Sequence, residues 1–192
     1  MTNLSLSVLA VAALWLAVFL VVPIVRAWRR WRGTRIVTCP ENKQAAAVDM
    51  DLRYAIAGSI AGRPELRLRD CSRWPERSAC GQVCLSQVEE SPEACLVRTT
   101  LERWYDARTC AYCRKPFGAL HWHDHKPGLR GPEGQLREWS AIPPETLPDV
   151  LSTHQAVCWN CLVAEGFRVR FPELVVERPA PLRPSGTIGG PS

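Results

Sequence analysis

The chain has 192 residues, a length that suits one compact domain with appendages. Its formal net charge is +5, and five arginines that follow the first apolar stretch account for all of it. The remaining chain is neutral overall, which argues against the strongly basic surface typical of nucleic-acid-binding proteins.

The first predicted element is a transmembrane anchor at residues 1–25. From Leu4 to Val25 no residue is charged, and a helix of this length reaches about 33 Å, enough to cross a hydrocarbon core of about 30 Å. A cleaved signal peptide is the alternative, but such a peptide carries positive residues before a shorter apolar core, and none precedes this one. Membrane lipid is therefore the expected partner of residues 4–25.

Residues 26–35 form a basic juxtamembrane segment. It contains Arg26, Arg29, Arg30, Arg32 and Arg35, together with Trp28 and Trp31, which fit an interfacial aromatic belt. Positive residues collect on the cytoplasmic side of a span, so we expect a single-pass membrane protein with its N-terminus outside and its C-terminal domain in the cytoplasm. Contact with anionic lipid headgroups is a second role for these arginines.

Residues 36–108 are predicted to form a cysteine-rich segment of mixed α and β structure. We expect a strand at residues 35–38, an alternating stretch at 66–69 and a short helix at 79–89. The apolar, alanine-rich stretch at 45–56 is compatible with a strand followed by a helix, and its pattern does not separate the two. A further helix is predicted from Ser91, a favourable N-cap, to about Tyr105, with Cys95, Leu96, Leu101 and Trp104 buried.

Residues 109–177 are predicted to form a second unit. The glycines of residues 128–134 indicate the turn of a hairpin, a short helix is expected from Pro143 to about Ser152, and a longer helix at 158–171 should end before Pro172. The proline- and glycine-rich tail at 178–192 is expected to be disordered.

Two CxxC pairs in the second unit carry the strongest functional signal. Cys110, Cys113, Cys158 and Cys161 have the spacing of a tetrahedral zinc site, in which one pair comes from a tight turn and the other from a distant element. A thioredoxin-like redox pair is the alternative, but no βαβ pattern surrounds either motif. The chain has nine cysteines, an odd number, and in a reducing compartment this usage favours metal thiolates over disulfides.

Along the chain, the turn with the first cysteine pair (the knuckle) is followed by a hairpin and then by a helix that carries the second pair. This order resembles that of the treble-clef zinc domains. Within that group, the sequence Asp124-His125-Lys126-Pro127-Gly128 resembles the HNH (ββα-metal) endonucleases. The resemblance implies that Asp124 ligates a catalytic divalent metal and that His125 acts as general base.

Two positions depart from the HNH pattern. The asparagine expected shortly before the second CxxC is replaced by the neighbourhood of His154, and the ligand expected just after it is replaced by Leu162. Glu165 or His154 would have to take the place of the missing metal ligands. The resemblance therefore implies the fold more firmly than the activity.

The alternating His121, His123 and His125 would share one face of a strand. Such a face predicts a second ligand set for zinc, iron or copper. The alternative is that these histidines only orient the hairpin through hydrogen bonds.

The remaining cysteines suggest a second site. Cys80 and Cys84 would share one face of a helix, and with Cys39 and Cys71 they form a candidate tetrahedral set. Cys95 is the alternative to Cys39, an iron–sulfur cluster is the less favoured occupant, and ordinary buried cysteines are the simplest interpretation.

The predicted fold class is α+β, a small zinc-nucleated treble-clef domain behind one N-terminal transmembrane helix. The favoured function is a membrane-anchored cytoplasmic zinc protein with one or two zinc ions, acting as a non-catalytic scaffold or regulator for an unknown protein partner. There are two alternatives. The first is an HNH-like metal-dependent endonuclease, which alone would have nucleic acid as its partner. The second is a thiol-based metal or redox sensor.

Overall fold

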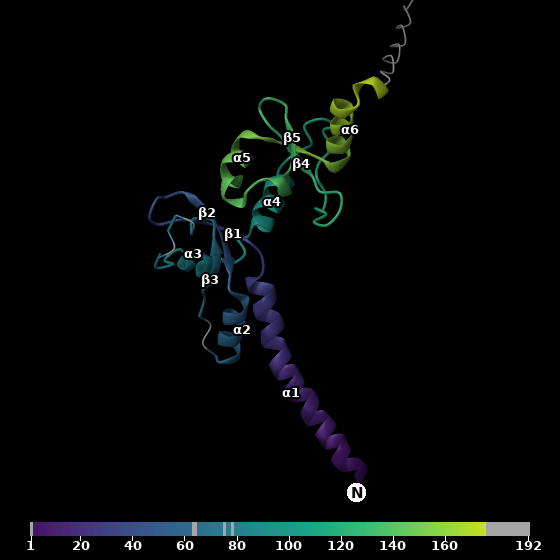
Figure 1. Ribbon diagram of the computed structural model, residues 1–192. Coiled ribbons are helices and arrows are strands. Elements are labelled where there is room, and N and C mark those ends of the chain that lie inside the picture. Colours follow the sequence, from purple (N-terminus) through teal and green to yellow (C-terminus); the bar gives the residue numbers. More distant parts are fainter. Residues whose placement is uncertain (1, 63–64, 75, 78, 176–192) are drawn as a thin grey trace, which may run out of the picture.

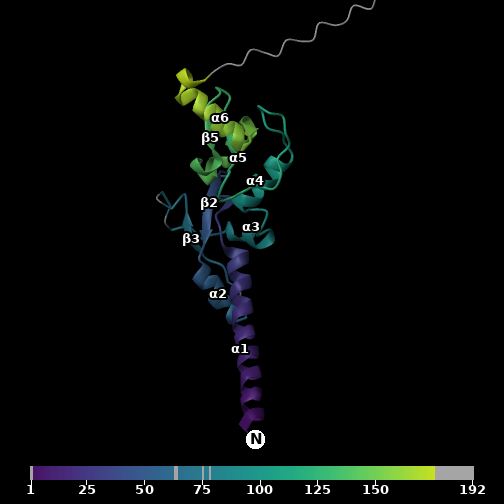
Figure 2. The same cartoon turned by 90° about the vertical axis from the view of Figure 1, so that its right-hand side faces the viewer.

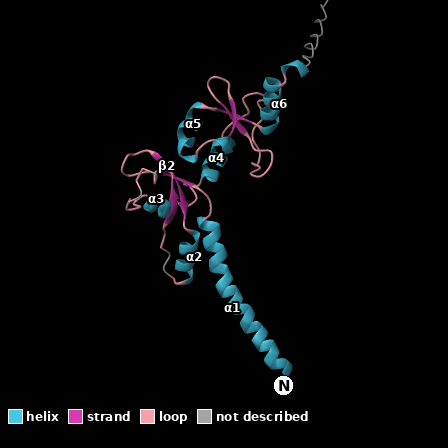
Figure 3. Ribbon diagram, viewed as in Figure 1, coloured by secondary structure: helices cyan, strands magenta, loops and turns pink. Residues whose placement is uncertain are grey.

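The computed structural model describes residues 2–62, 65–74, 76–77 and 79–175. It is a mixed α/β structure in which a long N-terminal helix projects away from two small three-stranded sheets (Figures 1 and 2). The first sheet has the order β1-β2-β3 and the second β5-β4-β6, and every pairing is antiparallel. The sheets lie in different halves of the molecule, and helices and loops account for most of the remaining chain (Figure 3).

Helix α1 runs from Thr2 to Trp31, well past the predicted end of the anchor. Its stretch Ser7–Trp31 is long and apolar enough to cross a membrane, and the apolar side chains of its first part are exposed. Among the described side chains, those of residues 8–21 are all exposed, which fits the prediction of an apolar N-terminal span.

The end of α1 corrects two details of the predicted juxtamembrane segment. Trp31 is buried in the first core rather than placed in an interfacial belt, and Arg35 is fully buried, whereas Trp28 is exposed. Four exposed arginines therefore remain as candidates for a membrane flank: Arg26, Arg29, Arg30 and Arg32.

The first sheet contains the strand predicted at residues 35–38, and the stretches at 45–56 and 66–69 each contribute to a further strand. It consists of β1 (Arg35–Thr38), β2 (Ala45–Met50) and β3 (Leu68–Cys71), and α2 (Leu52–Ile60) follows β2 directly. Asp51 begins α2 because its carboxylate accepts a hydrogen bond from the Tyr54 amide at 3.1 Å. Helix α2 lies beside the C-terminal part of α1 (Figures 1 and 2).

The two helices predicted after this sheet are shorter than expected. Helix α3 covers only Leu85–Glu90, because the chain before it turns through Gln82 with a φ of +53°. Cys80 therefore lies outside the helix, and the predicted helical face shared with Cys84 is wrong. Helix α4 covers Val97–Asp106, so Ser91 does not cap it and Cys95 lies outside it, while Leu101 and Trp104 are buried as predicted.

The second half contains β4 (Gly128–Arg130), β5 (Leu136–Glu138) and β6 (Gln155–Val157). The 3₁₀ turns η1 (Trp139–Ala141) and η2 (Pro144–Thr146) lead to α5 (Leu147–Thr153), and α6 (Trp159–Arg170) precedes η3 (Pro172–Leu174). The hairpin, the helix before Ser152 and the helix ending before Pro172 are confirmed. The tail at 178–192 lies outside the described residues.

Each half has its own buried cluster. The first gathers around the β1–β3 sheet and α3, with Val48, Leu68 and Val88 almost completely buried. The second joins α4, the hairpin and α5, and Trp104 donates from Nε1 to the Leu151 carbonyl at 2.9 Å. Helix α4 thus packs with the second core although it was predicted within the 36–108 segment; the domain division itself stays a prediction.

Candidate metal centre

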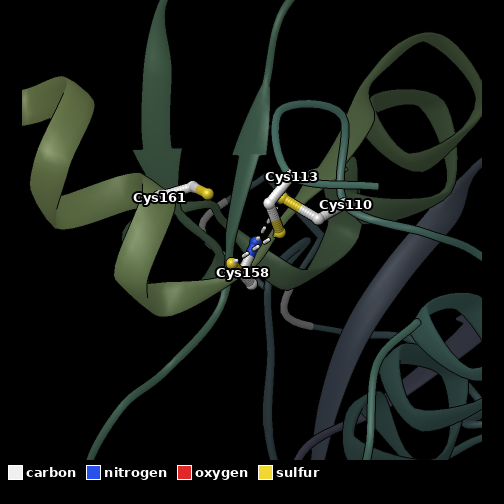
Figure 4. Close-up of side chains that lie close together, drawn as sticks. All are labelled: Cys110, Cys113, Cys158 and Cys161. Atoms are coloured by element: carbon white, nitrogen blue, oxygen red, sulfur yellow. Dashed lines mark hydrogen bonds between the residues drawn. The ribbon is translucent and has the colours of Figure 1, made fainter. Parts of the chain in front are cut away.

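Four cysteine sulfurs meet between the loop that follows α4 and the start of α6. The ligand atoms of Cys110, Cys113, Cys158 and Cys161 all lie within 4.8 Å of one another (Figure 4). The Sγ atoms of Cys113 and Cys158 are 3.8 Å apart. With Zn–S bonds of about 2.3 Å, the edge of a tetrahedral ZnS₄ unit is also about 3.8 Å, so this donor set fits a metal ion such as zinc.

The first pair lies in a tight turn held by main-chain bonds. The Cys110 amide donates to the Lys115 carbonyl at 2.9 Å, and the Arg114 amide donates back to the Cys110 carbonyl at 3.0 Å. Arg114 takes a φ of +60° to close the turn. The Ala111 amide donates to the Ala156 carbonyl at 2.8 Å, which joins the turn to β6 just before the second pair.

The second pair lies at the N-terminus of α6. Cys158 is the N-cap residue and Cys161 is in the first turn, so both sulfurs lie near the positive end of the helix dipole. The Cys158 amide donates to the Cys110 sulfur at 3.3 Å, which links the two pairs directly. The local sequence therefore forms the turn and the helix start that hold each cysteine pair. The hydrogen bond between Ala111 and Ala156 of β6 brings the two pairs together.

The electrostatics of the cluster favour a cation. Burial acts to raise the pKa of Cys110, but the amides of Cys158, Cys113 and Tyr112 donate toward its sulfur and lower the pKa to about 6. Burial and the neighbouring thiols raise the pKa values of Cys158 and Cys161. The Cys110 thiolate thus forms readily, whereas Cys158 and Cys161 would become thiolates only with a cation beside them.

The histidine segment does not form the predicted strand. Residues 122–125 form a series of bends, and His125 has a φ of +47°, so alternation does not place three histidines on one face. His121 and His125 instead flank Asp124, with Nδ1 atoms 3.7 and 3.3 Å from its carboxylate oxygens. His123 is exposed, and Trp122 packs into the second core beside Trp139.

A pocket of about 290 Å³ lies between this segment and the start of α6. His121 and His125 line it, and the His125 ring meets the Trp159 ring edge-on at 4.3 Å. Asn160, between the two cysteines of the second CxxC, also lines the pocket and was not singled out from the sequence. Its place within the metal-binding motif is the signal that could have identified it.

The two proposed substitutes for missing HNH ligands are engaged elsewhere. His154 Nδ1 lies 2.9 Å from the Thr153 hydroxyl, and Glu165 forms an ion pair with Arg168 at 2.7 Å. Neither residue lines the pocket beside His125. Leu162 packs over the hairpin, because a Cβ added to Gly128 would lie 2.7 Å from its Cδ1 atom.

The cysteines of the candidate second set lie in the first half of the molecule. Cys39, Cys71, Cys80 and Cys84 all line one pocket. The alternative ligand Cys95 does not line it; its sulfur lies 3.7 Å from the Gln87 carbonyl, and burial raises the pKa of its thiol against the opposing charge of Arg35.

Comparison of the chain with protein-family models, with curated proteins and with solved structures gives no significant match.

Proposed function

We propose that this protein is a single-pass membrane protein whose domain is a zinc-nucleated treble clef with a non-catalytic scaffolding or regulatory role. The observation that carries the proposal is the cluster of four cysteine ligand atoms within 4.8 Å. The order of its elements supports the treble clef: a cysteine knuckle, the β4–β5 hairpin, and a helix whose N-terminus holds the second pair. The expected partner is a protein at the membrane surface.

The ligand set supports a structural rather than a catalytic ion. Four thiolates complete a tetrahedron, whereas catalytic zinc sites keep one position open for water or substrate. Leu162 supports the same conclusion, since it occupies the position at which the HNH pattern expects a ligand and packs against Gly128 instead. The metal therefore holds the knuckle, the hairpin and α6 together, and any interaction surface depends on it.

The orientation of the chain is part of the proposal. The exposed arginines Arg26, Arg29, Arg30 and Arg32 follow the apolar span and favour a cytoplasmic location for everything after it. A reducing cytoplasm also keeps thiols available for zinc. A domain held by one ion beside the inner membrane surface suits recruitment or regulation of a soluble partner.

Zinc content and its structural effect test the proposal together. The full-length protein, purified in detergent, should contain zinc by elemental analysis, and a strong chelator should remove the zinc with loss of near-ultraviolet circular dichroism. Zinc-free protein, protein with a Cys110–Cys158 crosslink, or a spectrum unchanged by zinc removal would overturn the proposal.

A metal-dependent nuclease is the second candidate. It is favoured by the Asp124 carboxylate between the imidazoles of His121 and His125, two residues that line a pocket together with Asn160. A carboxylate and an imidazole in this arrangement suit binding a divalent ion and accepting a proton from water. Supercoiled plasmid incubated with the protein and Mg²⁺, Mn²⁺ or Zn²⁺ should be nicked by wild type and not by Asp124→Asn. No nicking with any of these ions would retire this candidate.

A further inference from the structure

The first half of the molecule contains a pocket that the proposed function does not use. It has a volume of about 70 Å³ and is enclosed by the β1–β2 turn, the end of β3 and the chain leading into α3. Strands β1 and β3 both run antiparallel to β2, so their C-terminal ends reach the same end of the sheet. Cys39 follows β1 and Cys71 ends β3, which brings two thiols from distant parts of the chain to one pocket.

The turn that carries Cys39 repeats the main-chain geometry of the turn that carries Cys110. The Cys39 amide donates to the Gln44 carbonyl at 2.8 Å, and the Lys43 amide donates back to the Cys39 carbonyl at 2.9 Å. Lys43 has a φ of +61°, as Arg114 has one of +60° at the matching position.

The sulfur environments of the two turns also match. The amides two and three residues after Cys39, those of Glu41 and Asn42, donate toward its sulfur, as the amides of Tyr112 and Cys113 do toward Cys110. The chain thus builds the same turn twice, and the turn at Cys39 has Asn42 at the position that Cys113 takes in the turn at Cys110.

Three further features of the pocket suit a bound cation. Cys80 and Cys84 line it beside Cys39 and Cys71, so four thiols from three parts of the chain face one pocket. The Arg73 guanidinium donates from Nη1 to the Cys39 sulfur at 2.9 Å, which places a cationic donor beside this thiol. Trp74 lines the pocket, and its Nε1–H is the one buried side-chain donor without a partner among the described residues.

We propose that Cys39, Cys71, Cys80 and Cys84 form a second tetrahedral thiolate site for zinc, independent of the Cys110 cluster. The four sulfurs are spaced more widely than those of that cluster, since in the described part of the chain only the latter has its ligand atoms all within 4.8 Å. Ion binding therefore draws the segment with Cys80 and Cys84 toward the β1–β2 turn. A thiolate held in the pocket supplies the class of acceptor that the Trp74 indole lacks.

Metal stoichiometry of the full-length protein in detergent tests the site. Wild type should bind two zinc ions, and Cys39→Ser and Cys84→Ser should each bind one. Cys95→Ser, which removes a cysteine outside both clusters, should still bind two. Cobalt(II) substitution gives a second measurement, because thiolate-to-cobalt charge-transfer absorption scales with the number of Co–S bonds and should fall to about half in Cys84→Ser.

Each result decides between the two sites. One zinc in wild type that is lost in Cys110→Ser but kept in Cys84→Ser overturns this inference and leaves the proposed function intact. One zinc in wild type that is lost in Cys84→Ser but kept in Cys110→Ser supports this inference and overturns the proposed function. Two zinc ions retained by Cys84→Ser, or iron with acid-labile sulfide in place of zinc, also overturns the inference. If Cys84→Ser aggregates, Cys39→Ser and the wild-type cobalt spectrum decide the same question.

Discussion

The guanidinium of Arg35 donates from Nη1 to the main-chain carbonyl of Trp31 at 2.8 Å, and this contact fixes the C-terminal end of α1 to the first sheet. The same side chain donates to the carbonyls of Arg30, Gly33 and Pro92 at 2.6, 3.0 and 3.2 Å. Carbonyls at a helix C-terminus lack partners within the helix, and a cation there also complements the helix dipole. Arg35 is therefore a structural clamp and not a membrane-flank charge.

Replacing the clamp should destabilise the domain strongly. Arg35→Met removes four hydrogen bonds from a charged donor and leaves buried carbonyls without partners, so we expect a loss of about 3 kcal/mol. Thermal unfolding in detergent should show a melting temperature lower by roughly 6–12 °C. The control Arg32→Met, an exposed arginine that stacks on Trp28, should change it by about 1 °C or less. Equal shifts for the two variants would contradict the clamp.

Loss of a thiolate at the knuckle should unfold the second half rather than weaken it slightly. A structural zinc ion contributes on the order of 10 kcal/mol to folding, more than the whole stability of many domains. Cys110→Ser should therefore lose one zinc and become sensitive to proteolysis across residues 97–170. Limited proteolysis followed by mass spectrometry would locate the cleavage sites. Unchanged cleavage kinetics would show that the ion has no structural role.

The packing of α6 on the hairpin depends on a residue without a side chain. A Cβ at Gly128 would lie 2.7 and 2.8 Å from the Leu162 methyl carbons and 2.9 Å from the Arg137 carbonyl oxygen. Gly128→Ala should thus destabilise the protein by about 1–3 kcal/mol, as measured by chemical denaturation. At Gly118 an added Cβ meets no atom within 4 Å, so Gly118→Ala is the matched control.

A double variant separates the two contacts of Gly128. Leu162→Ala combined with Gly128→Ala should recover part of the loss caused by Gly128→Ala, because the methyl clash disappears while the carbonyl contact remains. Strictly additive destabilisation would show that Leu162 does not determine how closely α6 approaches β4.

Membrane orientation should depend on the four exposed arginines. Changing Arg26, Arg29, Arg30 and Arg32 to glutamine removes the charge asymmetry while leaving the buried Arg35 in place. A fluorescent protein that folds only in the cytoplasm, fused after residue 175, should report high signal for wild type and a clear loss for the variant. The single change Arg32→Gln serves as control and should keep most of the signal. A dark wild-type fusion would reverse the proposed topology.

The sequence by itself determined the local features of this protein. An uncharged apolar run specifies a helix long enough to span a membrane, and the CxxC spacing specifies a turn that presents two thiols, because both depend only on neighbouring residues. The strands at residues 35–38 and 45–50 and the helix ending before Pro172 follow from the same short-range rules.

Only the tertiary structure decided which distant residues meet. Long-range pairing placed Ala156 against Ala111 and so brought the two cysteine pairs together. It also buried Arg35 against four carbonyls, which no charge count reveals. The histidines show the opposite outcome: their alternation predicted a strand, but the segment bends where the half-buried Trp122 packs against the second core. Burial of a large side chain outweighs a weak local pattern, and it depends on residues far away in the chain.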